Sequence, residues 1–151
     1  MNERKHPLAK CEECPLQVGG KLVSSEGPEK ASIAFVGEAP GIQEARGERQ
    51  FVGPSGKLLN LVLRHHNIDR DEVFLSNATL CRPNDGSAPT KSAISACRPR
   101  LLGELEDRGV ELAAALGLGD AVLFAFNGRN GAELFRARSY QDSSSSVFPV
   151  I

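Results

Sequence analysis

The stretch IAFVGEAPG (residues 33–41) joins a short, continuous apolar run to a loop rich in glycine and proline. An uninterrupted apolar run of this length is typical of a strand that is buried on both faces of a parallel sheet. Open α/β sheets bind their ligands at loops that follow the carboxyl ends of such strands. We therefore predict a buried strand over residues 33–36 and a ligand-binding loop over residues 37–41.

A helix and a second strand are predicted to follow this loop. Apolar residues recur at helical spacing over residues 58–63, with Ser55 as the predicted N-cap and Asn67 as the predicted left-handed stop. The short segment EVFL (residues 72–75) predicts the second strand. This alternation indicates an α/β fold, in which helices cover both faces of a mostly parallel sheet.

The C-terminal half continues the alternation. Thr90 is predicted to cap a helix whose apolar stripe places Cys97 on the inward face, and Pro99 is predicted to kink or restart that helix. Residues 110–116 fit a helix by composition and a buried strand by length. The other predicted elements are a helix over residues 121–126, a strand over residues 147–150, and loops over residues 15–30, 82–89, 127–131 and 143–146.

Length and composition indicate one soluble globular domain over residues 1–151. Of the 151 residues, 40% are hydrophobic and 25% are charged, and no apolar run is long enough to span a membrane. The formal net charge of −1 excludes a global attraction to nucleic acid, so such binding must come from a local patch. The first ten residues are polar and charged, unlike a signal segment, so we expect a reducing, cytoplasmic location.

All four cysteines fall into two spaced pairs, Cys11 and Cys14 in a C-x2-C pattern and Cys81 and Cys97 in a C-x15-C pattern. Two intervening residues let one turn direct both thiolates at the same ion or cluster, so the pattern predicts a metal or iron–sulfur site. The long second spacing suits a cluster held between two distant loops. Zinc, a disulfide framework and buried free thiols stay open as alternatives.

A local basic patch accompanies the second cysteine pair, because each of these cysteines is followed by arginine and proline. Cations beside thiolates offset the charge of a cluster and can also bind phosphate groups. A solvated surface with ordinary helix charges is the alternative interpretation. The predicted DNA phosphate contacts are Arg82, Lys91, Arg98 and Arg100.

Two nucleotide-binding motifs are excluded. The segment GPSGK (residues 53–57) resembles the end of a P-loop, but Phe51 occupies the first glycine position of that motif. Leu58 stands where a Ser or Thr must bind magnesium. The loop over residues 37–41 lacks the G-x-G-x-x-G pattern of dinucleotide-binding proteins.

Four motifs occur in order with the paired cysteines: GEAPG at 37–41 followed by Glu44, FVGPSGKLL at 51–59, SNATLCRP at 76–83 and SACRPRL at 95–101. In this order and spacing, the chain resembles the iron–sulfur uracil-DNA glycosylases of family 4, over roughly residues 8–120. The resemblance implies a three-layer α/β/α sandwich around a central, mostly parallel four-stranded sheet, and it favours a strand over residues 110–116.

The resemblance also implies a cofactor and an activity. It implies a [4Fe–4S] cluster with a structural role, held by Cys11, Cys14, Cys81 and Cys97. The implied activity is base excision repair of uracil-containing DNA by a monomer. In that reaction the N-glycosidic bond of uracil, the product of cytosine deamination, is hydrolysed after the base has left the duplex.

Site residues are implied in the same way. Glu38 and Glu44 are expected to position the hydrolytic water, and Asn77 to pair with uracil N3–H and O4 while rejecting the exocyclic amine of cytosine. Phe51 is expected to stack under the flipped base. The residues implied to bind uracil are Glu38, Ala39, Pro40, Phe51 and Asn77.

The chain also departs from the family pattern. Ala45 replaces an acid, Gly47 comes one position early, and Gln50 replaces the proline before Phe51. The family's His-Pro-Ser loop, whose histidine binds uracil O2, is not found, although residues 147–151 resemble the strand that leads into it. We expect weak or no hydrolysis by this chain alone. The alternative function is a non-catalytic iron–sulfur or zinc module that binds nucleic acid.

Overall fold

A computed structural model of the chain describes residues 5–109, 115–127, 138–141 and 147–150. One sheet of the described part is built from β2 (Ala34–Gly37), β3 (Phe74–Asn77), β5 (Ala115–Gly117), β6 (Arg138–Gln141) and β7 (Val147–Val150). Its strand order is β3-β2-β5-β7-β6. The first four strands in this order run parallel, and β6 pairs antiparallel with β7 at the edge.

The strands confirm the predicted α/β class. The predicted strands over residues 33–36, 72–75 and 147–150 correspond to β2, β3 and β7, and β3 begins two residues later than predicted. Residues 115–117 form a strand, whereas residues 110–114 lie outside the described part of the chain. We expected four strands, and the described sheet has five, because β6 had no counterpart among the predictions.

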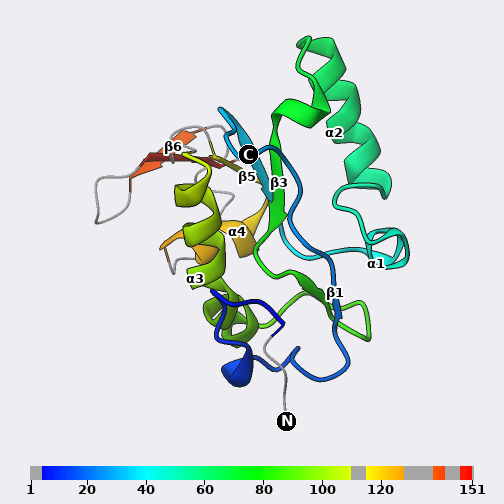
Figure 1. The fold of residues 1–151 in the computed structure, drawn as a ribbon, viewed down its shortest axis with the longest axis vertical. Helices are drawn as coiled ribbons and strands as arrows, with labels where there is room; N and C mark the ends of the chain where they lie inside the picture. Colours follow the sequence, from blue (N-terminus) through cyan, green and yellow to red (C-terminus); the bar gives the residue numbers. More distant parts are fainter. Residues whose placement is uncertain (1–4, 110–114, 128–137, 142–146, 151) are drawn as a thin grey trace.

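Helices cover both faces of the sheet. Figure 1 shows α2 (Pro54–His65) on one side of β3, and α3 (Lys91–Asp107) with α4 (Asp120–Asn127) on the other. Successive residues of a strand point to opposite faces. Ala34 and Val36 therefore pack in the core cluster of α3 and α4, while Phe35 packs with the apolar residues of α2.

The ends of α2 differ in part from the prediction. Ser55 is not the N-cap, because the helix begins at Pro54 and Gly53 is the capping residue. Proline suits the first helical position, since its fixed φ is already helical and its missing N–H would have no partner there. Asn67 adopts the predicted left-handed conformation, with a φ of 54°.

Helix α3 is capped as predicted but is not interrupted. The hydroxyl of Thr90 accepts a hydrogen bond of 3.3 Å from the backbone N–H of Ala93. The helix continues through Pro99, so the predicted restart is wrong, while the alternative of a kink at Pro99 stays a prediction. The residues that follow this proline, Leu101 and Leu105, are fully buried in the core, and this packing favours a continuous helix over a break.

The N-terminal segment forms short elements and contributes one strand to a separate two-stranded sheet. It contains η1 (Cys11–Glu13) and β1 (Lys21–Leu22), which lies within the predicted loop 15–30 and pairs antiparallel with β4 (Cys81–Arg82). Two further short elements are α1 (Ile42–Gly47) and η2 (Arg70–Glu72). Most of the predicted loop 127–131 and all of 143–146 lie outside the described residues. Within the described part, no helix is both long and apolar enough to cross a membrane.

Candidate functional site

An open pocket lies at the carboxyl ends of β2 and β3, where the sequence predicted a ligand-binding loop. Its volume is about 400 Å³, within the usual range for small-molecule sites. It brings together five of the six residues implied to bind uracil or to act in catalysis. These five are Glu38, Ala39, Glu44, Phe51 and Asn77. The sixth, Pro40, is buried in the loop that forms the pocket wall.

Gly37 allows the ring of Phe51 and the amide of Asn77 to meet. Gly37 and Asn77 are register partners on the parallel strands β2 and β3. A Cβ atom on Gly37 would overlap with Oδ1 of Asn77 and would lie 3.0 Å from Cζ of Phe51. The pocket therefore requires glycine at this position.

Phe51 is held in an unusual backbone conformation. Its φ is 48°, which is rare for a residue with a bulky side chain and carries strain. Two neighbours maintain it. The guanidinium of Arg70 donates to the backbone oxygens of Gln50, at 2.6 Å, and Phe51, at 3.4 Å. A Cβ atom on Gly56 would overlap with the backbone of Phe51, so only glycine fits there.

The amide of Asn77 has a buried partner. Asn77 is 4% exposed, and its Nδ2 donates a hydrogen bond to Oε1 of Gln50. Gln50 is itself completely buried, and its Nε2 donates to the backbone oxygens of Val23, at 2.9 Å, and Ser24, at 3.1 Å. The orientation of the Asn77 amide is therefore determined by residues outside the pocket.

The two candidate acids differ in environment. Glu44 is buried, and its Oε1 accepts hydrogen bonds from the backbone N–H groups of Val52, at 2.9 Å, and Gly53, at 2.7 Å. A carboxylate at this place, next to the N-terminus of α2, is favoured by the helix dipole. Glu38 is exposed at the pocket. Glu44 is thus tied to the Phe51 loop, while the carboxylate of Glu38 faces solvent.

Arg100 does not contact DNA phosphates, contrary to the prediction. Its side chain is completely buried, and a phosphate group cannot reach it. The guanidinium donates to Oγ of Ser76 and to the backbone oxygen of Asn77, both at 2.7 Å, and it forms an ion pair of 3.1 Å with Glu104. Arg100 therefore holds the end of β3 from behind the pocket.

The other three predicted phosphate contacts lie nearer the surface. Arg98 is half-buried and donates to the backbone oxygens of Ala125 and Phe126, both at 2.8 Å, so it caps the end of α4. Lys91 is exposed, with its ammonium group 5.6 Å from the ring centroid of Phe124. Arg82 is half-buried and donates to the backbone oxygen of the residue that follows it.

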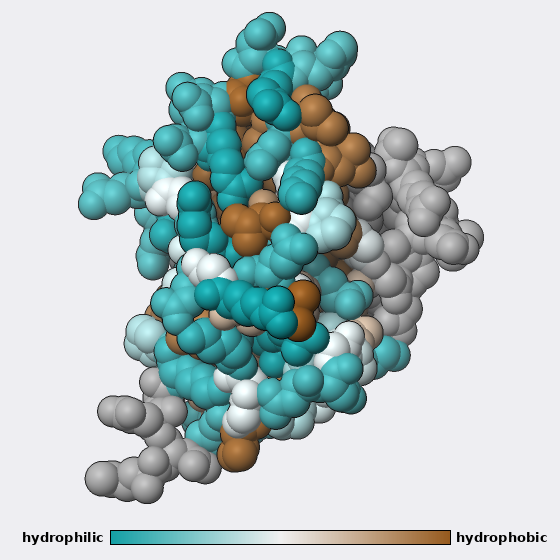
Figure 2. Space-filling view, turned by 90° about the vertical axis from the view of Figure 1, so that its right-hand side faces the viewer, coloured by the Kyte–Doolittle hydropathy of each residue, from teal (hydrophilic) through white to brown (hydrophobic). Residues whose placement is uncertain are grey.

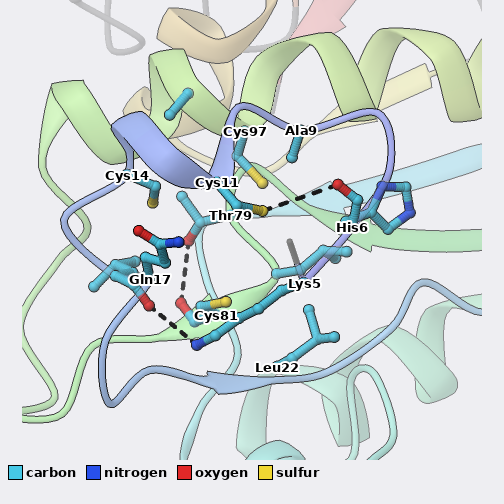
Figure 3. Close-up of a pocket in the computed structure, with 13 residues that line it drawn as sticks. Lys5, His6, Ala9, Cys11, Cys14, Gln17, Leu22, Thr79, Cys81 and Cys97 are labelled. Atoms are coloured by element: carbon cyan, nitrogen blue, oxygen red, sulfur yellow. Dashed lines mark hydrogen bonds between the residues drawn. The ribbon is translucent and has the colours of Figure 1, made fainter. Parts of the chain in front are cut away.

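A second pocket is lined by all four cysteines. Figure 3 shows Cys11, Cys14, Cys81 and Cys97 around one space. Cys11 belongs to η1 and Cys14 follows it, while Cys81 comes from β4 and Cys97 from α3. All four are free thiols in the structure. Among the described residues, no group of three or more His, Cys, Asp or Glu side chains is arranged to hold a metal ion. The donors match the sulfur ligands that iron–sulfur clusters require.

Burial changes the pKa of two of these thiols, Cys14 and Cys81. It raises the pKa of Cys81 to about 11 and also raises the pKa of Cys14, because a thiolate loses solvation there. The ammonium group of Lys5 acts against this effect and lowers the pKa of Cys81. Lys5 is held beside the cysteines by donating to the backbone oxygens of Leu16 and Gly20.

The sequence alone did not indicate three of the residues that build these sites. Gln50 was visible only as a departure from the family motif, Lys5 as one charge among many, and Arg70 gave no signal. The three histidines of the chain do not line the pocket at the ends of β2 and β3. His6 lines the cysteine pocket, while His65 and His66 stand at the end of α2.

Comparison with known proteins identifies the family of this chain. A family model described as the uracil DNA glycosylase superfamily matches residues 24–150. The type-4 uracil-DNA glycosylase of Sulfurisphaera tokodaii is 33% identical over 154 residues, which cover 96% of this chain and 70% of that protein. The protein of the same name from Pyrobaculum aerophilum is 34% identical over 150 residues, which cover 96% of this chain and 76% of that protein.

A third relative matches over a shorter stretch at higher identity. The type-4 uracil-DNA glycosylase of Thermotoga maritima is 38% identical over 111 residues, which cover 73% of this chain and 58% of that protein. The superfamily match and the coverage of the first two relatives agree with the order of the motifs in the sequence. On these grounds the chain belongs to the uracil DNA glycosylase superfamily, alongside its type-4 members.

Proposed function

We propose that this chain is a uracil-DNA glycosylase of base excision repair, which hydrolyses the N-glycosidic bond between uracil and deoxyribose in DNA. The observation that carries the proposal is the pocket at the ends of β2 and β3. It places an aromatic ring and a buried amide side by side in a chain whose relatives bear this name.

Binding begins with a base that leaves the stack. Unpairing costs a few kcal/mol, which the pocket must recover. The ring of Phe51 offers a flat apolar surface for stacking, a contact of about 1–3 kcal/mol. The loop from Gly37 to Gly41, with Ala39 and Pro40, closes the side of the pocket.

Selection of uracil depends on the amide of Asn77. Uracil presents a donor at N3 and an acceptor at O4, whereas cytosine presents an acceptor at N3 and a donor at N4. An amide whose oxygen meets N3–H and whose nitrogen meets O4 therefore fits uracil and leaves cytosine with two mismatched contacts. Mismatched polar contacts in a buried site reject a substrate strongly.

The chemical step needs a water molecule and a stabilised leaving group. As the bond between C1′ and N1 breaks, positive charge builds on the sugar and negative charge on the uracil. Water adds to C1′ and loses a proton, and the uracil anion gains one. Glu38 is the acid placed to orient this water, since its carboxylate is exposed at the pocket. We assign Glu44 to the support of the Phe51 loop, because its carboxylate is bonded there.

We also propose that Cys11, Cys14, Cys81 and Cys97 hold a [4Fe–4S] cluster. Four thiol donors around one small pocket, with Lys5 beside them to offset negative charge, support this assignment. Such a cluster would join the N-terminal segment, β4 and α3, and it would supply no redox step in the hydrolysis. Iron and sulfide analysis and visible absorption test it, and colourless protein that carries zinc would contradict it.

Several broader features are part of the same proposal. The chain acts as a single-domain monomer in a reducing compartment, where thiols are available for the cluster. The parallel strands β3, β2, β5 and β7 form the four-stranded centre of an α/β/α sandwich. Lys91, Arg82 and Arg98 provide the phosphate contacts, and binding should weaken steeply with salt.

The direct test is release of uracil from a single-stranded oligonucleotide, followed by alkali to cut the abasic site. Protein in excess over DNA lets a slow single turnover be detected. The controls are a cytosine oligonucleotide of the same sequence and the variant Asn77→Ala. Cleavage that needs both uracil and Asn77 supports the proposal. Binding without cleavage or preference for uracil, in cluster-loaded protein, would indicate a non-catalytic nucleic-acid-binding module.

A further inference from the structure

Gln50 occupies an unusual position for a polar side chain. It is completely buried in the loop before Phe51, and both ends of its amide are bonded. Its Nε2 donates to the backbone oxygens of Val23 and Ser24, and its Oε1 accepts from Nδ2 of Asn77. A buried amide with this degree of pairing has a single favourable orientation.

The direction of these bonds follows from the chemistry of the partners. Backbone oxygens can only accept, so the NH2 end of Gln50 must face Val23 and Ser24. Its oxygen then faces Asn77, which must present its own NH2 end in return. If the Asn77 amide were turned by 180°, its Oδ1 would face Oε1 of Gln50, and two acceptors would repel each other. Gln50 therefore selects one of the two amide orientations that an isolated asparagine can adopt.

The backbone of Gln50 is also anchored, so the side chain cannot drift. Its N–H donates to the carboxylate of Glu26, and its carbonyl oxygen accepts from Arg70 at 2.6 Å. Glu26 is itself held by an ion pair of 3.0 Å with Arg49. The three hydrogen bonds of the amide therefore start from a position that the surrounding structure defines.

The orientation of Asn77 decides which base the pocket accepts. With its NH2 end toward Gln50, Asn77 keeps Oδ1 as an acceptor for a base N–H and one hydrogen of Nδ2 as a donor. The turned amide would instead meet cytosine, whose acceptor and donor are exchanged. We infer that Gln50 is a positioning residue that makes the pocket select uracil over cytosine, because it holds the amide of Asn77 in one orientation. This inference rests on the proposed function.

The position is a feature of this chain. The family motif has proline before the phenylalanine, and proline has no side-chain amide to offer. Proline fixes the backbone through its ring. Gln50 fixes the backbone through a hydrogen bond to Glu26 and also orients the side-chain amide of Asn77.

The variant Gln50→Met tests the inference, because methionine has a similar length and makes none of the three hydrogen bonds. We expect the ratio of uracil to cytosine, measured by excision or by binding of otherwise identical oligonucleotides, to fall about 3- to 10-fold, the range for one hydrogen bond. Gln43→Met, the same substitution at an exposed position of α1, should leave the ratio unchanged. In the Asn77→Ala background, Gln50→Met should have no further effect on the ratio.

Two results would overturn the inference. One is an unchanged ratio of uracil to cytosine in folded Gln50→Met. The other is a fall in this ratio that is as large when Gln50→Met is added to Asn77→Ala as when it is added to wild type. A measurement on the wild-type protein covers the case in which the variant does not fold. A scalar coupling across the hydrogen bond, between Nδ2 of Asn77 and the side-chain carbonyl carbon of Gln50, should be detected by NMR. Absence of this coupling in folded protein contradicts the assigned orientation of the Asn77 amide.

The same experiments separate this inference from the proposed function. If wild-type protein neither excises uracil nor prefers it to cytosine, the proposed function fails and the specificity role of Gln50 fails with it, even where the coupling to Asn77 is detected. If wild-type protein is specific and Gln50→Met is equally specific, only the inference fails.

Discussion

Gly37 and Asn77 face each other across β2 and β3 at a distance that leaves no room for a Cβ atom on Gly37. Such an atom would overlap with Oδ1 of Asn77 and crowd Cζ of Phe51 at 3.0 Å. The backbone of Gly37 lies outside the left-handed region, so close contact alone accounts for the glycine. The first glycine of the GEAPG loop is therefore part of the pocket at the ends of β2 and β3.

The variant Gly37→Ala should lose uracil binding while the protein stays folded. The added methyl must displace the amide of Asn77 or the ring of Phe51, so we expect at least about a tenfold weaker preference for uracil. Gly47→Ala is a matched control, because a Cβ atom there meets nothing within 4 Å and alanine favours a helix by about 0.5–1 kcal/mol. Titration of uracil-containing and cytosine-containing oligonucleotides compares the two variants.

Glu44→Ala should destabilise the Phe51 loop. It leaves the backbone N–H groups of Val52 and Gly53 without their acceptor, and an unsatisfied buried donor costs about 1–3 kcal/mol. Denaturant unfolding measures this loss of stability, and oligonucleotide titration should show weaker binding at the same time. Glu44→Gln retains one oxygen and should lie between wild type and alanine. If Glu44→Gln keeps stability and binding but loses excision, Glu44 acts on the water directly.

Arg100→Met should lower stability sharply. Arg100 pairs with buried Glu104 and donates to the backbone oxygens of Asn77 and Ala78, and its Nη2 lies 3.4 Å from Sγ of Cys97. Removing one partner of a buried ion pair costs about 3–5 kcal/mol, because the other charge is left unpaired.

The measurement for Arg100 is the free energy of unfolding together with iron content. Arg100→Lys keeps the charge but not the planar guanidinium. It should therefore be more stable than Arg100→Met, but it should keep few of the hydrogen bonds at the end of β3. Variants of full stability and unchanged cluster loading would contradict the role assigned to Arg100.

Lys91→Ala should change DNA binding without changing the fold. Lys91 is exposed at the start of α3, so it can meet a phosphate where Arg100 cannot. Removing one phosphate contact reduces the slope of log K against log salt by about 1, with no change in preference between uracil and cytosine. Titrations at several salt concentrations measure this slope. An unchanged slope would remove Lys91 from the interface.

Sequence patterns predicted local chemistry well and burial poorly. The strand β2, the cap at Thr90 and the left-handed Asn67 follow from residue types whose preferences are local. The burial of Arg100 and the continuation of α3 through Pro99 were not predicted, because a charge or a proline in a sequence does not reveal which neighbours the fold will supply.

The same limit applied to the pocket. Its phenylalanine, asparagine and acids were expected together from the motifs, and the structure places them there. The buried partner of Asn77 was not predicted, because the contact between Gln50 and Asn77 joins residues 27 positions apart.

Exposure on α2 was not predicted either. Figure 2 shows that the face of the molecule that carries α2 is largely hydrophilic but has hydrophobic residues at the level of that helix. Leu58, Leu61 and Val62 are exposed on α2, although they belong to the apolar pattern that predicted this helix.

Cluster-free protein should lose stability in alkali because of Cys81. Burial raises the pKa of this thiol from 9.0 to about 11, so between these values the folded protein keeps a proton that the unfolded chain has lost. The stabilising effect is fully present below pH 9 and is lost as the pH rises through about 11. Denaturant unfolding of the cluster-free protein at pH 8 and 10.5 should show this fall. In Cys81→Ser, whose hydroxyl does not ionise in this range, the fall in the free energy of unfolding should be smaller. An equal fall in both proteins would mean that the loss of stability does not come from Cys81.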